Sequence, residues 1–363
     1  GAVVVKYGHG LPLKRVRVVE GGHPVPDGAG EAGAREIVET LRAPQPADLV
    51  FCLISGGGSA LSPAPAPGVS LEDKQAVTRL LLASGATIHE MNVVRKHLSR
   101  LKGGQLARLA QPARVISLIL SDVVGDELDI IASGPTVADP STFKEAMDIL
   151  ELRNLRIGVP DTVLDHFRAG IEGRIPETPK PGDPALSRVR NLIVGSNRMA
   201  LVAAEEKARA LGYRVLLPSG FEEGEAREVG KAHAELARIY RQNRRTPGPP
   251  ACILTGGEPT VTLRGEGKGG RNQELALAAA MVLEGMESTV LLSAGTDGTD
   301  GPTDAAGAVV DETTAVRGRG AGLDPSDYLE RNDSYRFLEP LGDLLMTGPT
   351  RTNVMDLRVL LLG

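Results

Sequence analysis

Three glycines between two serines follow an apolar run near the start of the chain. In VFCLISGGGSAL, residues 50–61, the loop residues are Ser55, Gly56, Gly57, Gly58 and Ser59. Glycine lets the backbone adopt positive φ and approach a ligand closely, and the free N–H groups of a following helix favour an anion. The loop therefore predicts a phosphate or carboxylate site. The alternative is a tight strand-to-helix turn without a ligand, and the loop contains neither GxGxxG nor GxxxxGK[ST].

A second Gly-Gly loop, TGGEP, follows the apolar run ACIL in the second half of the chain. We expect Gly256 and Gly257 to contact a phosphate. Glu258 is expected at the carboxyl edge of a sheet, where ligands of α/β proteins bind. The alternative for Glu258 is a solvated turn carboxylate.

A basic glycine loop, GEGKGGRNQE, leads into an Ala/Leu-rich helical stretch. Lys268 and Arg271 bring positive charge to a helix start whose dipole is already positive, and an anionic ligand would offset that cost. Arg271 is the predicted catalytic cation, because a guanidinium grips phosphate oxygens in pairs and stabilises a phosphoryl group in transfer. The other predicted phosphate contacts are Gly269, Gly270, Asn272 and Gln273. The alternative is a solvated basic loop.

An acidic loop, GTDGTDGPTD, follows another apolar run. Asp297 and Asp300 are the predicted metal ligands, because carboxylates suit Mg²⁺, which shares its oxygen ligands with substrate phosphates. The spacing does not match an EF-hand, and the alternative is a turn in which aspartates bond to the local backbone. In the first half of the chain, Asp122 and Asp126 follow a strand in the same manner.

The stretch NVVRKHLSRLKGGQLA, residues 92–107, places Arg95, Ser99 and Lys102 on one face of a helix. The favoured interpretation is a solvated charged face that ends at a glycine pair. The lone His23, in the rigid turn HPVPD, is interpreted as structural.

These loops together supply a phosphate cradle, a cation clamp and Mg²⁺ ligands, which are the parts that phosphoryl transfer needs. The sequence contains no nucleophile elbow with a Ser-His-Asp order and no zinc-type spacing of cysteines and histidines.

The elements that must position these loops alternate between short β-branched runs and longer helical stretches. This pattern is typical of βα units with a parallel or mixed sheet, and it predicts an α/β fold. The predicted strands are 3–6, 16–19, 49–54, 113–120, 192–195, 214–217, 251–254, 290–293 and 357–362. The predicted helices are 30–41, 71–84, 88–101, 142–150, 161–170, 198–211, 222–243 and 270–284.

A proline-rich, charged segment, EGRIPETPKPGDPAL, is the predicted linker between two domains, residues 1–186 and 187–363. The chain opens on AVVVKY, which reads as a strand without a lead-in. We therefore expect the N-terminal domain to lack its first βα unit.

Composition excludes several classes of protein. A net charge of -5, an aromatic content of 3% and the absence of Trp argue against a nucleic-acid partner. No apolar stretch approaches the length of a membrane span. Cys52 and Cys252 lie inside apolar runs and are expected to be buried free thiols, which fits a cytoplasmic setting. Composition gives no indication of an oligomeric state.

Seven ordered motifs resemble those of the class II glycerate kinases, the glycerate 2-kinases with a C-terminal MOFRL domain. They are LISGGGSAL, RKHLSRLKGGQLA, LSDVVGDELDIIASGPTVAD, TGGEPTV, GKGGRNQELAL, SAGTDGTDGPTDAAGA and MTGPTRTNVMDLRVLL. The resemblance implies ATP-dependent phosphorylation of D-glycerate to 2-phosphoglycerate, with ATP and Mg²⁺, in the cytoplasm. It also implies two Rossmann-like α/β/α domains with the active site in the cleft between them.

The same resemblance bears on single residues. Arg271 matches the arginine proposed for catalysis in the family. Family members also carry an N-terminal segment with a Gly-Lys-Ala loop, which has no counterpart in this sequence. Either the sequence is a fragment, or another cation such as Lys96 or Lys268 substitutes for the lysine of that loop. A cleft carboxylate, Asp122 or Glu258, is expected to orient the glycerate hydroxyl. Two alternatives stay open: a hydroxypyruvate reductase, which the absence of GxGxxG disfavours, and a non-catalytic metabolite sensor.

Overall fold

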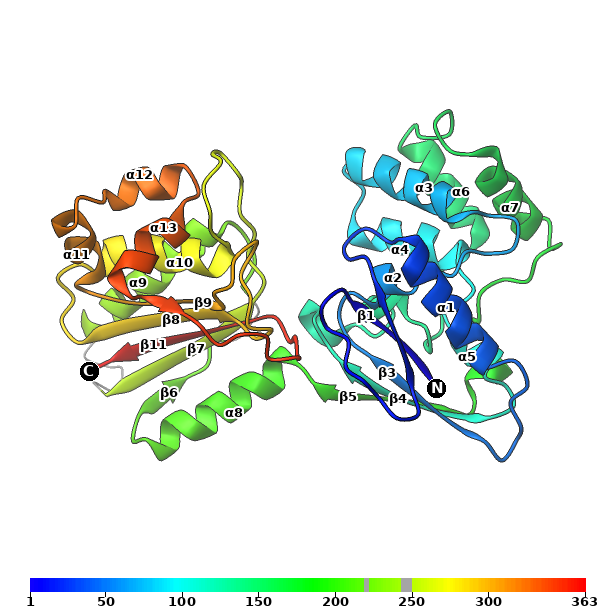
Figure 1. The fold of residues 1–363 in the computed structure, drawn as a ribbon, viewed down its shortest axis with the longest axis horizontal. Coiled ribbons are helices and arrows are strands. Elements are labelled where there is room, and N and C mark those ends of the chain that lie inside the picture. Colours follow the sequence, from blue (N-terminus) through cyan, green and yellow to red (C-terminus); the bar gives the residue numbers. More distant parts are fainter. Residues whose placement is uncertain (219–221, 243–249) are drawn as a thin grey trace. The chain divides into compact units, whose positions relative to one another are not determined.

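The computed structural model describes residues 1–218, 222–242 and 250–363 (Figure 1). The chain forms two compact units, Gly1–Val194 and Gly195–Gly363, and each combines strands with helices. The predicted α/β class is therefore confirmed. Within the described ranges, no helix combines the length and the apolarity that a bilayer crossing requires.

The strands of the first unit form two sheets. β1 (Ala2–Lys6) and β2 (Arg17–Gly21) make a parallel pair. β3 (Leu49–Ile54), β4 (Arg114–Leu120) and β5 (Val189–Gly195) follow one another in a second sheet. Because β3 and β4 run parallel, the loops that follow them leave the sheet at the same edge.

The boundary between the units follows from the position of β5. The predicted linker, residues 172–186, does not separate the units, because the chain continues beyond it into β5, which pairs with β4. The two units divide between Val194 and Gly195. The predicted domain boundary after Leu186 therefore lies ahead of the last strand of the first unit.

Helices of the first unit begin where the sequence supplies caps. Ser70, Thr87 and Thr142 each close a capping box with an acidic residue three positions later, which satisfies two N–H groups at the helix start. The helices are α1 (Gly28–Thr40), α2 (Gly58–Leu61), α3 (Leu71–Ala83), α4 (Ile88–His97), α5 (Gln105–Leu109), α6 (Phe143–Leu152) and α7 (Asp161–Ile171). Short 3₁₀ turns are η1 (Val124–Asp126), η2 (Ile131–Ser133) and η3 (Pro184–Leu186). Helices α3, α4, α6 and α7 share one apolar core around Phe143 and Phe167.

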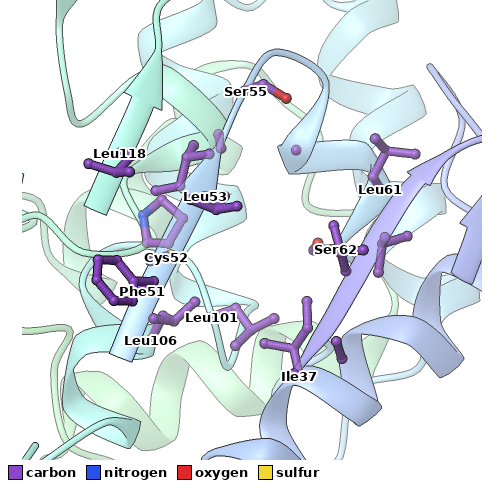
Figure 2. Close-up of a pocket in the computed structure, with 18 of the residues that line it drawn as sticks. Ile37, Phe51, Cys52, Leu53, Ser55, Leu61, Ser62, Leu101, Leu106 and Leu118 are labelled. Carbon is purple, nitrogen blue, oxygen red and sulfur yellow. The ribbon is translucent and has the colours of Figure 1, made fainter. Parts of the chain in front are cut away.

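An apolar cavity of about 540 Å³ lies between β1 and β3. Figure 2 shows β3, with Phe51 and Leu53, on one side of this cavity and the β1 side, with Ile37 of α1 near it, on the other. Phe51 and Leu53 are 60% and 72% exposed, and because they are two positions apart they lie on the same face of β3, which is therefore uncovered. The expected lack of a first βα unit stays a prediction.

The second unit is built on one mixed sheet in the order β10-β9-β8-β11-β7-β6. The strands are β6 (Arg214–Leu216), β7 (Ala251–Gly257), β8 (Thr289–Gly295), β9 (Gly307–Asp311), β10 (Leu344–Leu345) and β11 (Asp356–Leu362). β11 lies antiparallel to both β7 and β8, and the pairing of β6 with β7 is parallel. The start of β11 therefore lies between the carboxyl ends of β7 and β8.

Helices cover both faces of this sheet (Figure 1). They are α8 (Asn197–Ala210), α9 (Ala226–Gln242), α10 (Arg271–Leu283), α11 (Thr314–Gly320), α12 (Pro325–Glu330) and α13 (Ser334–Leu338), followed by η4 (Glu339–Leu341). Along β7, Ala251 and Ile253 pack with α9 and α10, whereas Cys252 and Leu254 pack with α8. This period of two makes three layers, as predicted for an α/β/α domain. The last residue of the predicted helix 222–243 lies outside the described residues.

Candidate active site

Three loops of the second unit meet at one edge of its sheet. Asp356, the first residue of β11, is in register with Gly257 at the end of β7 and with Gly295 at the end of β8. The TGGEP loop and the acidic loop therefore start beside each other. Together with the basic glycine loop they line a cavity of about 840 Å³, which includes Glu258, Arg271 and Asp297.

Arg271 is the first residue of α10 and points to two carboxylates. Its Nε and Nη2 donate to the two oxygens of Asp356 at 2.8 and 2.9 Å, and its Nη1 donates to Glu258 Oε1 at 2.5 Å. Burial alone lowers the pKa of Arg271, but Asp356 and Glu258 outweigh it and raise that pKa above its ordinary value. The charge at this helix start is therefore offset by the protein's own carboxylates.

A network of buried and partly buried side chains, Arg358, Glu222 and His233, supports the Asp356 carboxylate. Arg358, 0% exposed, places Nη2 3.6 Å from Asp356 and donates from Nη1 to Glu222 at 3.0 Å. His233 Nε2 lies 3.2 Å from the same Glu222 oxygen. The pKa of Glu222 lies below its ordinary value: burial raises it, and His233 and Arg358 outweigh that burial. Because the Arg358 guanidinium lies between the carboxylates of Asp356 and Glu222, the Asp356 carboxylate is fixed in position.

Asp300, a predicted metal ligand, caps helix α10. Its oxygens accept hydrogen bonds from the backbone N–H of Asn272 at 3.0 Å and of Gln273 at 2.9 Å. The side-chain amides of the same two residues also donate to it, at 3.2 and 3.0 Å. Burial raises the pKa of Asp300 to about 6 against these hydrogen bonds. Asn272 and Gln273 therefore direct their donors to Asp300, and their predicted contact with a phosphate stays a prediction.

Asp297 and Lys268 are placed differently. Asp297 lines the cavity, and its oxygens accept from the backbone N–H and the hydroxyl of Thr299, both at 3.0 Å. The Lys268 ammonium lies over the ring of Tyr335, 3.5 Å from its centroid, and Tyr335 donates to Asp304 at 2.9 Å. The Lys268 ammonium thus makes a cation–π contact with Tyr335. Gly269 and Gly270 line the cavity beside Arg271.

The SGGGS loop of the first unit follows β3 and lies against Asp122, which follows β4. A Cβ added to Gly56 would lie 2.0 Å from Asp122 Oδ2, and one added to Gly57 would lie 2.8 Å from the His23 ring. Gly57 also has φ +76°, which favours glycine. Burial, and then the charge of Lys6, lower the pKa of His23. The close approach of Asp122 explains why position 56 has no side chain.

The helix after this loop is shorter than the sequence suggested. α2 contains only Gly58–Leu61, so its dipole contributes little to anion binding. The Ser59 hydroxyl lies 3.0 Å from that of Ser133. The predicted anion contact of the loop, including Ser55 and Ser59, stays a prediction.

The charged face of the stretch that contains α4 is buried, and its interpretation as solvated is wrong. Lys96 is 4% and Lys102 3% exposed. Lys96 Nζ lies 3.2 Å from Asp129 and 3.5 Å from the fully buried Asp139. Two carboxylates therefore hold Lys96 within the unit. The burial of Lys96 was not predicted, because its partners Asp129 and Asp139 lie more than 30 residues further along the chain.

Both cysteines are free thiols, as predicted. Cys252 is buried, whereas Cys52 is only partly covered. Burial raises the pKa of each thiol to about 11, so neither is a thiolate near neutral pH.

Comparisons with known proteins identify the family. Residues 1–168 match a domain of unknown function, DUF4147, and residues 251–356 match the MOFRL family. A glycerate 2-kinase of Pyrococcus horikoshii is 45% identical over 98% of this chain and 80% of its own. The chain belongs to the glycerate 2-kinase family.

Two further relatives bear on the activity of this family: one is a glycerate kinase of known structure, and the other is named as a reductase. The crystal structure of a glycerate kinase (EC 2.7.1.31) from Thermotoga maritima matches 100% of this chain and 85% of its own with a TM-score of 0.92 and 44% identity. An Agrobacterium vitis protein, 45% identical over 100% of this chain and 81% of its own, carries the provisional name of hydroxypyruvate reductase.

The donor set at the cavity of this family member suits Mg²⁺ bound jointly with phosphates. Among residues 1–218, 222–242 and 250–363, no three His, Cys, Asp or Glu side chains gather as a metal cage. Mg²⁺ does not require such a cage, because it usually takes one or two carboxylates together with water and substrate phosphates. Asp297 and Glu258 both line the cavity and supply carboxylate oxygens of this kind.

Glu222, Asp356 and Arg358 are the residues of this site that sequence reasoning missed. The available signal was the last apolar run, MDLRVLLL, where an acid and a base two positions apart interrupt a strand and must share one face. Glu222 carried no comparable signal.

Proposed function

We propose that this protein is a glycerate 2-kinase, which transfers the γ-phosphoryl group of ATP to the 2-hydroxyl group of D-glycerate. The observation that carries the proposal is Arg271, which is held by two carboxylates and lines a cavity together with the glycine loops. The glycerate kinase names of relatives at 44–45% identity support the same substrate.

Arg271 is proposed to bind the transferring phosphoryl group. Two of its nitrogens are fixed on buried Asp356, whereas the third contacts Glu258, which is an exposed side chain. A phosphate oxygen would replace Glu258 at that nitrogen, and the guanidinium would then stabilise charge that develops in transfer. Gly269 and Gly270 line the same cavity beside Arg271.

Asp297 and Glu258 are the residues proposed to hold Mg²⁺ with the ATP phosphates. When bound, the ion would neutralise charge on the phosphate oxygens. The pairing of Asp297 with Thr299 keeps its carboxylate at the start of the acidic loop.

In the first unit, Asp122 is proposed to orient the glycerate hydroxyl, because it lies against the backbone of the SGGGS loop. Asp122 and that loop stand at one edge of the sheet, since β3 and β4 are parallel. The cytoplasmic setting, the absence of a nucleic-acid partner and the role of Lys96 in catalysis stay predictions.

The test is a kinase assay with MgATP and D-glycerate, in which enolase, pyruvate kinase and lactate dehydrogenase convert 2-phosphoglycerate into NADH loss. We expect a signal without phosphoglycerate mutase. A signal that requires the mutase would show the 3-phosphate, and ADP formation without either signal would exclude glycerate as acceptor.

The reductase name of the Agrobacterium vitis relative motivates a control. NADH and hydroxypyruvate are mixed with the protein, and absorbance is followed without ATP. We expect no change, whereas steady oxidation would favour the reductase.

A further inference from the structure

Three cations lie in the interior of the first unit. They are Lys74 of α3, Arg95 of α4 and Lys102, which lies between α4 and α5. Lys74 is 8% and Lys102 3% exposed, and Arg95 is partly buried. Removing a charge from water is costly unless an opposite charge or hydrogen bonds replace the water. We call these three residues the buried cation cluster.

The buried cation cluster lacks the carboxylates that such a group normally has. Lys74 Nζ has no hydrogen-bond partner, and Arg95 makes no hydrogen bond or ion pair with any residue that the structure describes. Lys102 Nζ donates to the carbonyl oxygens of Ser59 at 2.8 Å and Ser62 at 3.4 Å, which are neutral. By contrast Lys96, the neighbour of Arg95, lies between Asp129 and Asp139.

The cations act on one another directly. Burial and then the charge of Arg95 lower the pKa of Lys74 to about 7, and the charge of Glu31 in α1 opposes them. Burial and then the charges of Lys74 and Arg95 hold the pKa of Lys102 well below its ordinary value. The three groups therefore repel one another, and an anion among them would relieve that repulsion.

A further donor without a partner lies on α4, the helix that carries Arg95. Asn92 lies one helical turn before Arg95, is 4% exposed, and its Nδ2 has no partner among the described residues. Its Oδ1 accepts from Ser133 at 2.9 Å, and the Ser133 hydroxyl lies 3.0 Å from that of Ser59. Lys102 donates to the backbone carbonyl of the same Ser59. A buried amide without an acceptor is rare, and an oxygen of a bound anion would satisfy it.

We propose that Lys74, Arg95, Lys102 and Asn92 form an oxyanion site behind the SGGGS loop, which takes a carboxylate or a phosphate group. The site differs from the cavity around Arg271, which is lined by the second unit alone. Its charge and its unsatisfied donors do not depend on the proposed kinase activity.

The test is calorimetric titration of the full chain with sodium phosphate and, separately, with D-glycerate at constant ionic strength. Lys74→Met keeps the bulk of the side chain and removes the ammonium, and we expect it to weaken binding by about 10-fold or more. Arg95→Met is the second variant and should act alike. Lys144→Met, which removes an exposed ammonium from α6, is the matched control and should leave binding unchanged.

The outcomes separate the sources of the anion. Binding of phosphate alone assigns a phosphate, binding of glycerate alone assigns a carboxylate, and both support the site if Lys74→Met weakens them. No binding to the parent chain overturns the proposal. Binding that survives Lys74→Met and Arg95→Met but is lost in Arg271→Ala also overturns it, since the anion then belongs to the second unit. A failure of the kinase assay with this binding intact would leave the site standing and remove only the proposed function.

Discussion

Arg271 and Asp356 form a two-pronged ion pair in which a cavity-lining guanidinium is fixed by a fully buried carboxylate. The pair joins the first residue of α10 to the first residue of β11, 85 positions apart in the chain. β11 lies between β7 and β8. Asp356 therefore also fixes the position of Arg271 relative to the TGGEP loop and the acidic loop, which follow those two strands.

Arg271→Ala is expected to lower kcat/KM for glycerate phosphorylation by about 100- to 1,000-fold, because it removes a donor to the transferring group. The same change leaves buried Asp356 with only Arg358 nearby. The double variant Arg271→Met with Asp356→Asn controls for this by removing both charges. Equal activity of Arg271→Ala and the parent in the coupled assay would contradict the role of Arg271.

Lys96→Met is expected to destabilise the protein by about 3–5 kcal/mol, because it leaves the fully buried Asp139 without its cation. Urea unfolding followed by circular dichroism measures the change. Lys144→Met, at an exposed ion pair, should stay within about 0.5 kcal/mol of the parent. Unchanged stability combined with lost turnover would instead support the catalytic role that the family resemblance suggested.

The apolar cavity between β1 and β3 predicts binding of an apolar fluorescent dye by the native chain. Leu53→Gln should weaken the dye signal with little change in thermal stability, since Leu53 is 72% exposed and loses little packing. Leu152→Gln, 76% exposed on α6, is the matched control and should leave the signal unaltered. A signal that Leu53→Gln does not change would place the dye elsewhere.

Gly56→Ala tests the contact between the SGGGS loop and Asp122. The new methyl group would lie 2.0 Å from the Asp122 carboxylate, so that the carboxylate must move. If Asp122 orients the substrate hydroxyl, kcat should fall about 100-fold or more. Gly28→Ala, at the start of α1, meets nothing within 4 Å and serves as the control. Full activity of Gly56→Ala would remove Asp122 from the reaction.

The sequence predicted the elements whose signals are local. The strand 49–54 and the helix 71–84 agree with β3 and with α3, Leu71–Ala83, because an apolar run and a Ser-x-x-Asp cap are each readable within a few residues. β9, Gly307–Asp311, escaped prediction because it follows an acidic glycine loop and is held by pairing with β8 and β10.

At the candidate active site, too, local features could be predicted from the sequence and long-range contacts could not. The loops that carry Gly256 and Arg271 were predicted from local composition. The partners of Arg271 and Lys96 were not, because Asp356 and Asp139 reach them only through sheet register and chain folding over 43 to 85 positions. The capping contacts of Asp300 were not predicted, because the sequence does not reveal that α10 starts beside it, and its role as a metal ligand stays a prediction.

Asp300 makes stability depend on pH in a direction opposite to that of an ordinary carboxylate. Burial raises its pKa to about 6 in the folded chain, above the value of about 3.9 for an unfolded Asp. The native state therefore holds the proton more tightly, and ionisation of Asp300 costs stability as the pH rises from about 4 to 6. Between pH 7 and pH 4 the parent should gain about 2 kcal/mol relative to Asp300→Asn, which cannot titrate.

Urea unfolding of the parent and Asp300→Asn at pH 4, 5, 6 and 7 measures that difference. Asn keeps one oxygen to accept from the start of α10, so that most of the helix cap survives in the variant. Both chains share every other titrating group, and these cancel in the comparison. A difference that stays constant with pH would show that Asp300 is already ionised at pH 4, with the four donors of Asn272 and Gln273 outweighing its burial. In that case the carboxylate would be a permanent negative charge beside Arg271.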